Sequence, residues 1–296
     1  MRYKIRHITE YSYQEMVSIG HNRLCLVPLN NNGQQCLSSN ITILPAPDEL
    51  AYQTDFFGNT LLFISIYKEH DQLEITSEST VDIVNRPNAD RVQASQAAWQ
   101  DLKNQIATNS EIYADVMQYA LPSIHVPYSE AIRKFASDCF PDGATLWSGC
   151  QSLMQKIYSS LDFTPGFTTV NTPVESVLIS RKGVCQDFAH LMIACLRNMG
   201  LPARYVSGYI ETFPPPGKEK LVGSDASHAW VSVYFPEIGW VEFDPTNNLL
   251  PSNNHITVAV GRDYFDVAPI KGIIFSSGKQ NIVVKVDVNR IDNLVS

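Results

Sequence analysis

The first 86 residues alternate between apolar and polar positions. Four segments carry this period-two pattern or are dense in β-branched and aromatic residues: 1–13, 40–47, 60–68 and 72–85. Turn-forming residues separate them, among them the run from Asn30 to Gly33 and the pair Gly58 and Asn59. Because alternate side chains of a strand point to opposite faces, the pattern predicts an antiparallel, sandwich-like β domain.

The pattern changes around residues 86–90. Residues 91–121 are rich in helix formers, and prolines then punctuate a mostly helical region up to about residue 161. This change predicts a β-rich N-terminal domain over residues 1–88 and a second domain over residues 89–296. The connection between them is short, so we expect the two domains to pack closely.

The second domain continues as a helix followed by strands. Residues 185–199 place apolar side chains at helical spacings, and Gly200 follows as a helix stop. Three strand-like segments come next: 203–211, 228–235 and 239–246. A last alternating strand, about residues 280–292, either completes the core sheet or returns to the N-terminal domain. The fold class predicted is α+β.

Composition and charge exclude some classes of protein. The chain has 296 residues and a formal net charge of −8, with a sequence pI of about 5.3. It has no run of Lys and Arg beyond isolated pairs, so no nucleic-acid partner is expected. No stretch approaches about 18 apolar residues and the first residues do not resemble a signal peptide. We therefore expect a cytoplasmic protein without a membrane partner.

Six cysteines are present, and they are widely spaced: Cys25, Cys36, Cys139, Cys150, Cys185 and Cys195. A long chain without a secretion signal favours reduced thiols over a disulfide framework. No CxxC or HxxxH pair occurs, so a structural zinc site has little support. We expect no metal and no cofactor, and five of the six thiols are expected to be small apolar residues.

Cys185 differs from the other five because it begins the predicted helix 185–199. Unpaired N–H groups and the helix dipole at such a position stabilise a thiolate. Gly183 provides backbone freedom just before the helix. Free cysteines are nevertheless most often simply buried, so this position alone leaves a core residue and a nucleophile both open.

Two later residues complete a possible catalytic arrangement. His228 begins one predicted strand, and Asp244 ends the next. Adjacent strands bring such residues side by side, and an imidazole oriented by a carboxylate can take the proton of a thiol. Each residue has an ordinary structural interpretation, but the order Cys, His, Asp on helix, strand and strand is more informative than any member.

Several blocks of sequence resemble the bacterial transglutaminase-like proteins. These are GVCQDFAHL, ARYVSGY, SHAWVSVYFPEIGWVEFDPTNN and VAVGRDYFDVAPIKG, while SIGHNRLCLVP and DFFGNTLLFISI resemble the β-rich domain that precedes the core in that family. The resemblance implies a papain/transglutaminase-like core, with a nucleophile helix packed on an antiparallel sheet. It also implies that Cys185 is the nucleophile, His228 the general base and acid, and Asp244 the group that orients the imidazole.

Other polar residues near these blocks are expected to be structural. His190 lies five positions after Cys185, about 140° round the helix at roughly 100° per residue. Asp187 is expected to cap the helix rather than to catalyse. For Arg262 or Asp263, a structural ion pair is expected rather than a role in binding substrate. Trp147 is a candidate for lining the cleft.

The sequence therefore favours a thiol enzyme that acts on the amide carbonyl of a peptide or protein through a thioester. Hydrolysis and transfer to an amine share the first half-reaction, so the triad does not separate them. The alternatives are a cysteine peptidase without transferase activity and a non-catalytic module that binds peptides or proteins.

Overall fold

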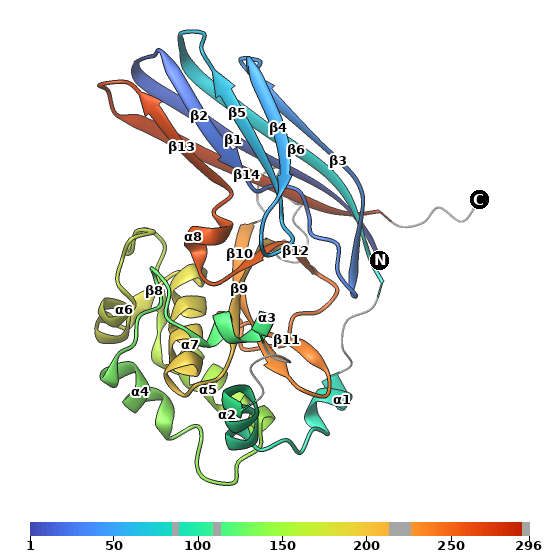
Figure 1. The fold of residues 1–296 in the computed structure, drawn as a ribbon. Coiled ribbons are helices and arrows are strands. Elements are labelled where there is room, and N and C mark those ends of the chain that lie inside the picture. The colour runs from blue at the N-terminus through green and yellow to red at the C-terminus, as the bar shows by residue number, and fades with distance from the viewer. Residues whose placement is uncertain (85–88, 109–113, 213–225, 292–296) are drawn as a thin grey trace, which may run out of the picture.

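The computed structural model describes residues 1–84, 89–108, 114–212 and 226–291. Figure 1 shows a lobe of long strands above a lobe in which helices pack around a shorter sheet. Sheets with antiparallel neighbours and helices thus occur in one chain, which confirms the predicted α+β fold class. The expected boundary at residue 88 lies in the segment 85–88, outside the described residues.

The upper lobe is a sandwich of two four-stranded antiparallel sheets. Strands follow one another in the order β14-β1-β6-β3 in one sheet and β13-β2-β5-β4 in the other. Alternate residues of β1 are buried, as its period-two pattern predicts. The strands are β1 (Arg2–Val17), β2 (Ile19–Leu24), β3 (Gln34–Leu44), β4 (Glu49–Thr54), β5 (Thr60–Ile66), β6 (His70–Ile83), β13 (Ile270–Phe275) and β14 (Gln280–Ile291).

The end of the chain returns to this upper lobe. β14 pairs with β1 along twelve residue pairs, from Arg2 opposite Ile291 to Tyr13 opposite Gln280. β13 pairs in the same way with β2. Of the two arrangements predicted for the last strand, the structure has the return to the N-terminal β domain, and β13 joins the same lobe. The second lobe consequently lies between two parts of the sandwich along the chain.

The lower lobe contains the helices and a second antiparallel sheet in the order β11-β10-β9-β12. Its strands are β7 (Asp162–Phe163), β8 (Lys182–Gly183), β9 (Ala203–Ile210), β10 (Ala226–Phe235), β11 (Gly239–Phe243) and β12 (His255–Gly261). Its helices are α1 (Ala89–Gln93), α2 (Trp99–Thr108), α3 (Ala114–Met117), the 3-10 helix η1 (Gln118–Ala120), α4 (Glu130–Ser137), α5 (Leu146–Ser160), α6 (Val174–Ser180), α7 (Cys185–Asn198) and α8 (Tyr264–Val267).

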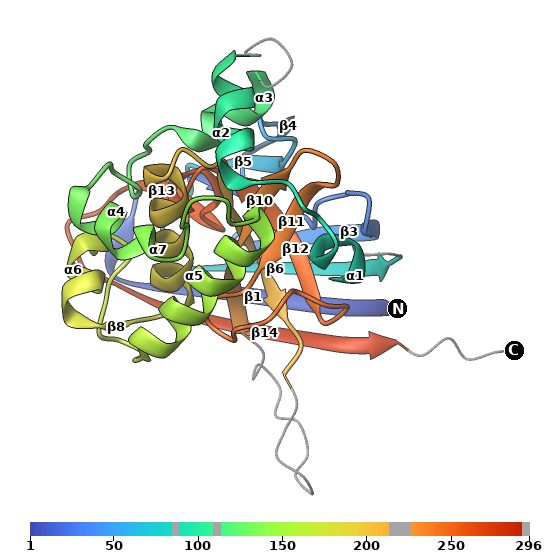
Figure 2. The ribbon, with the colours of Figure 1, turned by 90° about the horizontal axis from the view of Figure 1, so that it is seen from below.

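Helix α7 is the centre of the lower lobe. Every residue from Asp187 to Arg197 is buried, because β9 and β10 cover one side and α4, α5 and α6 cover the others. Figure 2 shows this helix surrounded by the other helices and the sheet. A helix buried all round has a fixed axis, so the position of its first residue, Cys185, is fixed as well.

Two buried side-chain amides of the upper lobe cover the outer edge of β12. Gln34 accepts a hydrogen bond from the Thr257 N–H (2.8 Å) and donates one to its carbonyl (2.7 Å). Asn59 does the same with Val260, at 2.9 Å and 2.8 Å. β12 ends its sheet, so its outward backbone groups need partners other than a strand. The side-chain amides of Gln34 and Asn59 therefore take the place of a neighbouring strand and join the two lobes.

None of the helices in the described part of the chain is both long enough and apolar enough to cross a membrane.

Replacing the Asn59 amide is expected to destabilise the protein. Asn59→Leu leaves the buried Val260 N–H and carbonyl without their partners, and each loss costs about 1–3 kcal/mol. The midpoint of thermal unfolding should fall clearly, whereas Asn40→Leu at an exposed position of β3 should leave it nearly unchanged. Equal midpoints for the two variants would contradict the role given to Asn59.

Candidate active site

The first turn of α7 holds Cys185 at the start of the helix. Val184 is the N-cap, with φ −117° and ψ 177°. The Asp187 carboxylate accepts hydrogen bonds from the Val184 N–H (2.8 Å) and from the Thr168 hydroxyl (2.6 Å). Asp187 thus caps the helix, as the sequence analysis expects. Burial raises the pKa of the Asp187 carboxyl, and these two hydrogen bonds oppose that change.

Gly183 is needed for space rather than for backbone freedom. It is not among the glycines with positive φ. A Cβ at this position would lie 2.7 Å from the Asp187 Cβ and 2.8 Å from its Oδ2. The expectation that Gly183 supplies conformational freedom is therefore wrong. Its missing side chain lets the capping carboxylate reach back over the helix start.

His228 and Asp244 lie on neighbouring strands of the sheet that α7 covers. β10 and β11 pair with Val231 opposite Phe243, and Asp244 directly follows β11. The His228 Nε2 lies 2.8 Å from the Asp244 Oδ2. Cys185 lines the same cleft as His228, and its side chain is one of the groups that raise the pKa of His228. The structure therefore brings the three expected residues together: Cys185 and His228 line one cleft, and His228 contacts Asp244.

The electrostatics of this chain favour a charged imidazole beside a charged carboxylate. Burial alone would lower the pKa of His228, but the hydrogen bonds and negative charges of Asp244 and Cys185 raise it to about 10. Burial would raise the pKa of Asp244, yet the hydrogen bonds from His228 and His255 hold it well below its usual range. At neutral pH the pair is therefore an imidazolium and a carboxylate.

Two further residues hold the Asp244 carboxylate, and the sequence analysis did not identify them. Asn247 donates from its Nδ2 to Oδ2 (2.7 Å) and from its backbone N–H to Oδ1 (3.2 Å). His255 lies with its Nε2 3.2 Å from Oδ2. Asn247 could have been found, because it comes three residues after Asp244 in a turn. His255 comes from another strand, β12, and no spacing in the sequence indicates it.

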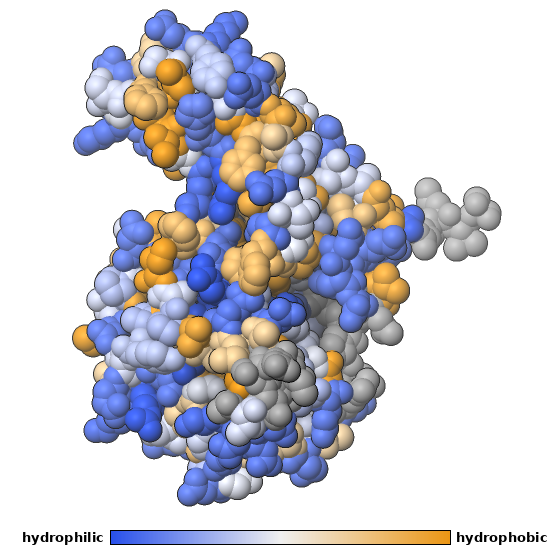
Figure 3. Space-filling model, viewed as in Figure 1, coloured by the Kyte–Doolittle hydropathy of each residue, from blue (hydrophilic) through white to orange (hydrophobic). Residues whose placement is uncertain are grey.

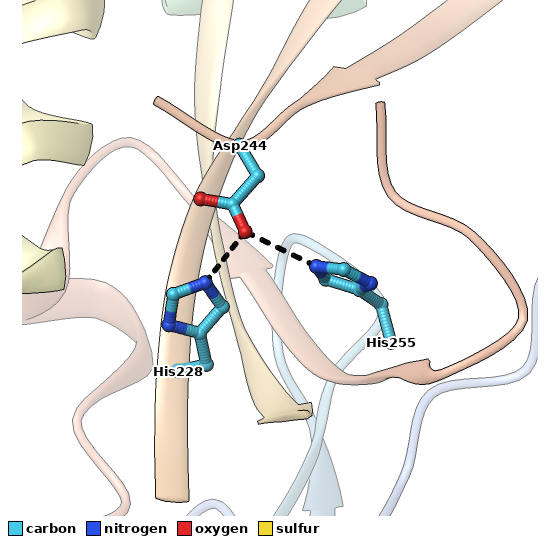
Figure 4. Close-up of side chains that lie close together, drawn as sticks. All are labelled: His228, Asp244 and His255. Carbon is cyan, nitrogen blue, oxygen red and sulfur yellow. Dashed lines mark hydrogen bonds and ion pairs between the residues drawn. The ribbon is translucent and has the colours of Figure 1, made fainter. Parts of the chain in front are cut away.

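Figure 4 shows the rings of His228 and His255 directed at the same carboxylate oxygen of Asp244. The possible ligand atoms of these three residues all lie within 4.8 Å of one another, and all three residues are buried. Among the described residues this is the group that could hold a metal ion. The hydrogen bonds to Asp244 already account for the closeness of the three side chains.

Cys185 and His228 open into a cleft of about 430 Å³. Both lobes contribute to its lining, and Tyr205, Ser207 and Tyr264 are among the residues of the lower lobe. The charge of the Cys185 side chain is one reason why the pKa of Tyr205 is raised well above its ordinary value, after the larger effect of burial. The cleft size falls in the range of ligand pockets, roughly 300–1,000 Å³. Figure 3 shows that the surface is hollowed between the two lobes.

The other polar candidates lie away from the reacting groups. His190 is buried, accepts a hydrogen bond from the Tyr264 N–H (3.1 Å) and stacks on His125. Arg262 forms its ion pair with Asp266 (2.9 Å), not with Asp263. Asp263 caps α8 instead. The structural ion pair expected for Arg262 is therefore present, because the turn into α8 places the Asp266 carboxylate beside the guanidinium.

The remaining aromatic and sulfur candidates are structural. Trp147 packs against Phe243 and is not among the cleft residues. All six cysteines are free thiols, and four of them are buried: Cys25, Cys139, Cys150 and Cys195. Burial raises the pKa of Cys25 to about 12.

Comparison with known proteins identifies the family. A family model for the bacterial transglutaminase-like N-terminal region matches residues 3–82, and one for the transglutaminase-like superfamily matches residues 134–245. The uncharacterized protein Rv2569c of Mycobacterium tuberculosis is 38% identical over 298 residues, covering 97% of this chain and 92% of that protein. The chain belongs to the bacterial transglutaminase-like family. Cys185, His228 and Asp244 all lie inside the second match.

Two further proteins are similar to this transglutaminase-like chain, one in fold and one over part of the sequence. A solved structure from Cytophaga hutchinsonii, described as a candidate cysteine protease, has the same fold with a TM-score of 0.76. It is 22% identical, and the match covers 99% of this chain and 92% of that one. The protein-glutamine gamma-glutamyltransferase of Pseudomonas aeruginosa is 41% identical over 73 residues, which is 24% of this chain and 11% of that protein.

The role of His255 can be tested by replacing its hydrogen bond. His255→Leu removes a donor from the Asp244 carboxylate, which raises the pKa of Asp244 and weakens its hold on His228. The rate of Cys185 alkylation by iodoacetamide should fall about 10-fold. This corresponds to roughly 1.4 kcal/mol, the size of one lost hydrogen bond to a charged group. On the acid side of the pH profile, the alkylation rate of this variant should also begin to fall at a higher pH than that of the wild type.

His255→Gln retains an N–H donor and should recover much of the rate. His21→Leu, an exposed position on β2, is the control and should match the wild type. If both His255 variants reacted at the wild-type rate across the pH range, His255 would not position the site.

The raised pKa of His228 predicts a pH-dependent contribution to stability. An imidazole in the unfolded chain has a pKa of about 6.5, whereas His228 has one of about 10 in the folded protein. The folded state therefore binds the proton more tightly. The contribution is complete below about pH 6.5 and is lost as the pH rises toward 10.

The difference in the urea midpoint between the wild type and His228→Gln measures this contribution. It should be largest near pH 6 and should shrink steadily up to pH 10, while Asp244 stays ionised throughout. A difference that is constant or grows over this range would show that His228 is not protonated in the folded protein.

Proposed function

We propose that this protein is a cysteine enzyme that acts on amide carbonyls of peptides or proteins through a thioester acyl-enzyme. Cys185 is the nucleophile, His228 the general base and acid, and Asp244 the group that orients His228. The observation that carries the proposal is that Cys185 and His228 line one cleft and that the buried Asp244 carboxylate is hydrogen-bonded to His228. It is the arrangement that thiol chemistry requires.

Acylation begins from the ion pair in which the Cys185 thiol has already given its proton to His228. The sulfur attacks the carbonyl carbon of the substrate, and the carbonyl oxygen becomes negatively charged. The backbone N–H of Cys185, at the start of α7, is placed to donate to this oxygen. His228 then gives the proton to the amide nitrogen, the C–N bond breaks, and the amine leaves the thioester behind.

Deacylation repeats these steps with a new acceptor. His228 removes a proton from water or from an amine as that group attacks the thioester carbonyl. Water yields a carboxylic acid, so the enzyme acts as a peptidase, isopeptidase or deamidase. An amine yields a new amide, which is the outcome named for the Pseudomonas aeruginosa relative. In both cases the Cys185 thiol is released.

Asp244 supports both half-reactions by stabilising the imidazolium. Its carboxylate is fully buried and is held on Oδ1 by the Thr246 N–H (3.0 Å) in addition to Asn247 and His255. A carboxylate fixed in this way keeps the His228 ring in one orientation. The proton therefore moves between the thiol and the leaving group, while Asp244 stays ionised.

The test is intact-protein mass spectrometry of enzyme incubated with a peptide library, with and without an added primary amine. A mass increase equal to an acyl group on Cys185 is expected in the wild type. It should disappear in Cys185→Ala and persist in Cys36→Ala, which removes the other thiol that is not buried. Amidated products with the amine indicate transfer, and free acids alone indicate hydrolysis.

Peptides that remain bound without any acyl-enzyme would support a binding module instead. A Cys185→Ser protein that retained full activity on every amide tested would also end the proposal, because a hydroxyl does not replace the thiolate in this arrangement.

A further inference from the structure

The wall of the cleft opposite the reacting groups comes from the upper lobe. Cys185 and His228 lie on one side, and residues of β1 and β14 lie on the other. The contributing residues of these two strands are His7, Thr9, Tyr11, Ile282 and Val284. A substrate whose carbonyl reaches the Cys185 sulfur must therefore pass along this wall.

The strand register places these side chains on one face. Thr9 lies opposite Val284, and Tyr11 lies opposite Ile282. Since side chains alternate between faces, His7, Thr9 and Tyr11 point to the same side as their partners on β14. β14 is the last strand of its sheet, so the wall ends at a strand edge.

Two branched apolar side chains of this wall are only half covered. Ile282 is 48% exposed and Val284 is 50% exposed. Farther along the same face, Val286 and Val288 are 2% and 0% exposed because they pack into the core. The part of the face beside the cleft thus keeps apolar surface open to solvent, next to the reacting thiol.

The described residues that line the cleft include no Lys, Arg, Asp or Glu. His7 is buried, and burial lowers its pKa to about 4, so it is neutral at neutral pH. Its ring lies 3.0 Å from the Tyr209 hydroxyl and 2.9 Å from the Thr9 hydroxyl. The charged Lys285 is paired with Glu10 (2.7 Å), and neither residue lines the cleft.

We propose that Tyr11, Ile282 and Val284 form a subsite for a bulky, uncharged apolar side chain that flanks the reacting amide in the substrate polypeptide. The inference rests on the proposed function and specifies its substrate class. His228, the charged group of the cleft, is engaged with Asp244, so a charged side chain beside Ile282 and Val284 would lose hydration without gaining a partner of opposite charge. An apolar one would cover the open surface of Ile282 and Val284.

The size of the cleft agrees with such an occupant. A volume of about 430 Å³ leaves room beyond the reacting group itself. The upper lobe then determines which substrates are acylated, while the catalytic groups remain in the lower lobe. The subsite is continuous with the thiol, so its occupant and the reacting carbonyl belong to one molecule.

The test changes the charge of the wall without touching the reacting groups. Val284→Lys places a cation in the subsite. Val283→Lys places the same charge one residue away on the opposite face of β14, at a position that is 39% exposed. Both proteins are first compared with the wild type by thermal unfolding and by the rate at which iodoacetamide alkylates Cys185. The acylation rates are then divided by the alkylation rate of each protein, because iodoacetamide is too small to need the subsite and reports the reactivity of the thiol alone.

Wild type and both variants are then incubated with peptides of fixed length that carry one glutamine and randomised neighbours, and the acyl-enzymes are identified by mass. The wild type should select peptides with Leu, Ile, Val or Phe beside the reacting residue. Val284→Lys should lose about 10- to 100-fold in kcat/KM for these peptides and should gain acidic ones. Val283→Lys should keep the wild-type selection.

Acylation of the wild type by apolar and charged peptides alike would overturn the subsite and leave the proposed function standing. The same conclusion follows if Val284→Lys and Val283→Lys select identical peptides. If the wild type forms no acyl-enzyme with any peptide, the proposed function fails and the subsite fails with it.

Discussion

The buried carboxylate of Asp244 is the group on which the candidate site depends. Removing a charge from water is costly unless it is paired and hydrogen-bonded. Here His228 and His255 approach one oxygen, and the backbone of the following turn satisfies the other. The Asp244 backbone also bonds Leu249 in both directions, which closes the turn. The carboxylate and the turn hold each other in place, and His228 takes its orientation from them.

The second constraint is the burial of α7. Because neighbours cover this helix on all sides, its first turn cannot shift relative to the sheet that carries His228. Asp187 and the absent side chain of Gly183 then hold the Cys185 backbone at the helix start. The position of Cys185 relative to His228 thus follows from two rigid elements, a helix and a sheet.

The upper lobe forms one unit with the catalytic lobe. Gln34 and Asn59 complete the edge of β12, and the Tyr3 hydroxyl donates to Glu211 (3.2 Å). His7 connects β1 to Tyr209 of β9. These contacts hold the wall of the cleft at a fixed position relative to Cys185. A β-rich domain placed in this way forms part of the cleft into which Cys185 opens.

Much of this arrangement could be predicted from the sequence, because local patterns indicate it. Alternating residues predicted the strands of the upper lobe, and the spacing of apolar residues predicted α7. Cys185, His228 and Asp244 could be selected because each stands at the end of a recognisable element. What the sequence did not reveal depends on contacts between distant segments. His255 comes from a separate strand, and β13 returns to a lobe that begins more than 200 residues earlier.

The error about Gly183 has the same origin, because the role of this glycine depends on where Asp187 points. Which carboxylate pairs with Arg262 likewise depends on how the chain turns into α8. Neither geometry has a signature in the order of residues. The wall of Ile282 and Val284 likewise becomes visible only when β14 is placed beside β1.

The most direct test of a reactive thiol paired with His228 is site-resolved alkylation of all six cysteines by iodoacetamide at pH 6. Cys185 should react far faster than the others, because only a thiolate attacks the reagent and the proposed function has His228 take the proton of this thiol. His228→Gln should remove this advantage. Uniformly slow labelling of the wild type, or fast labelling of Cys185 that persists without His228, would contradict the account.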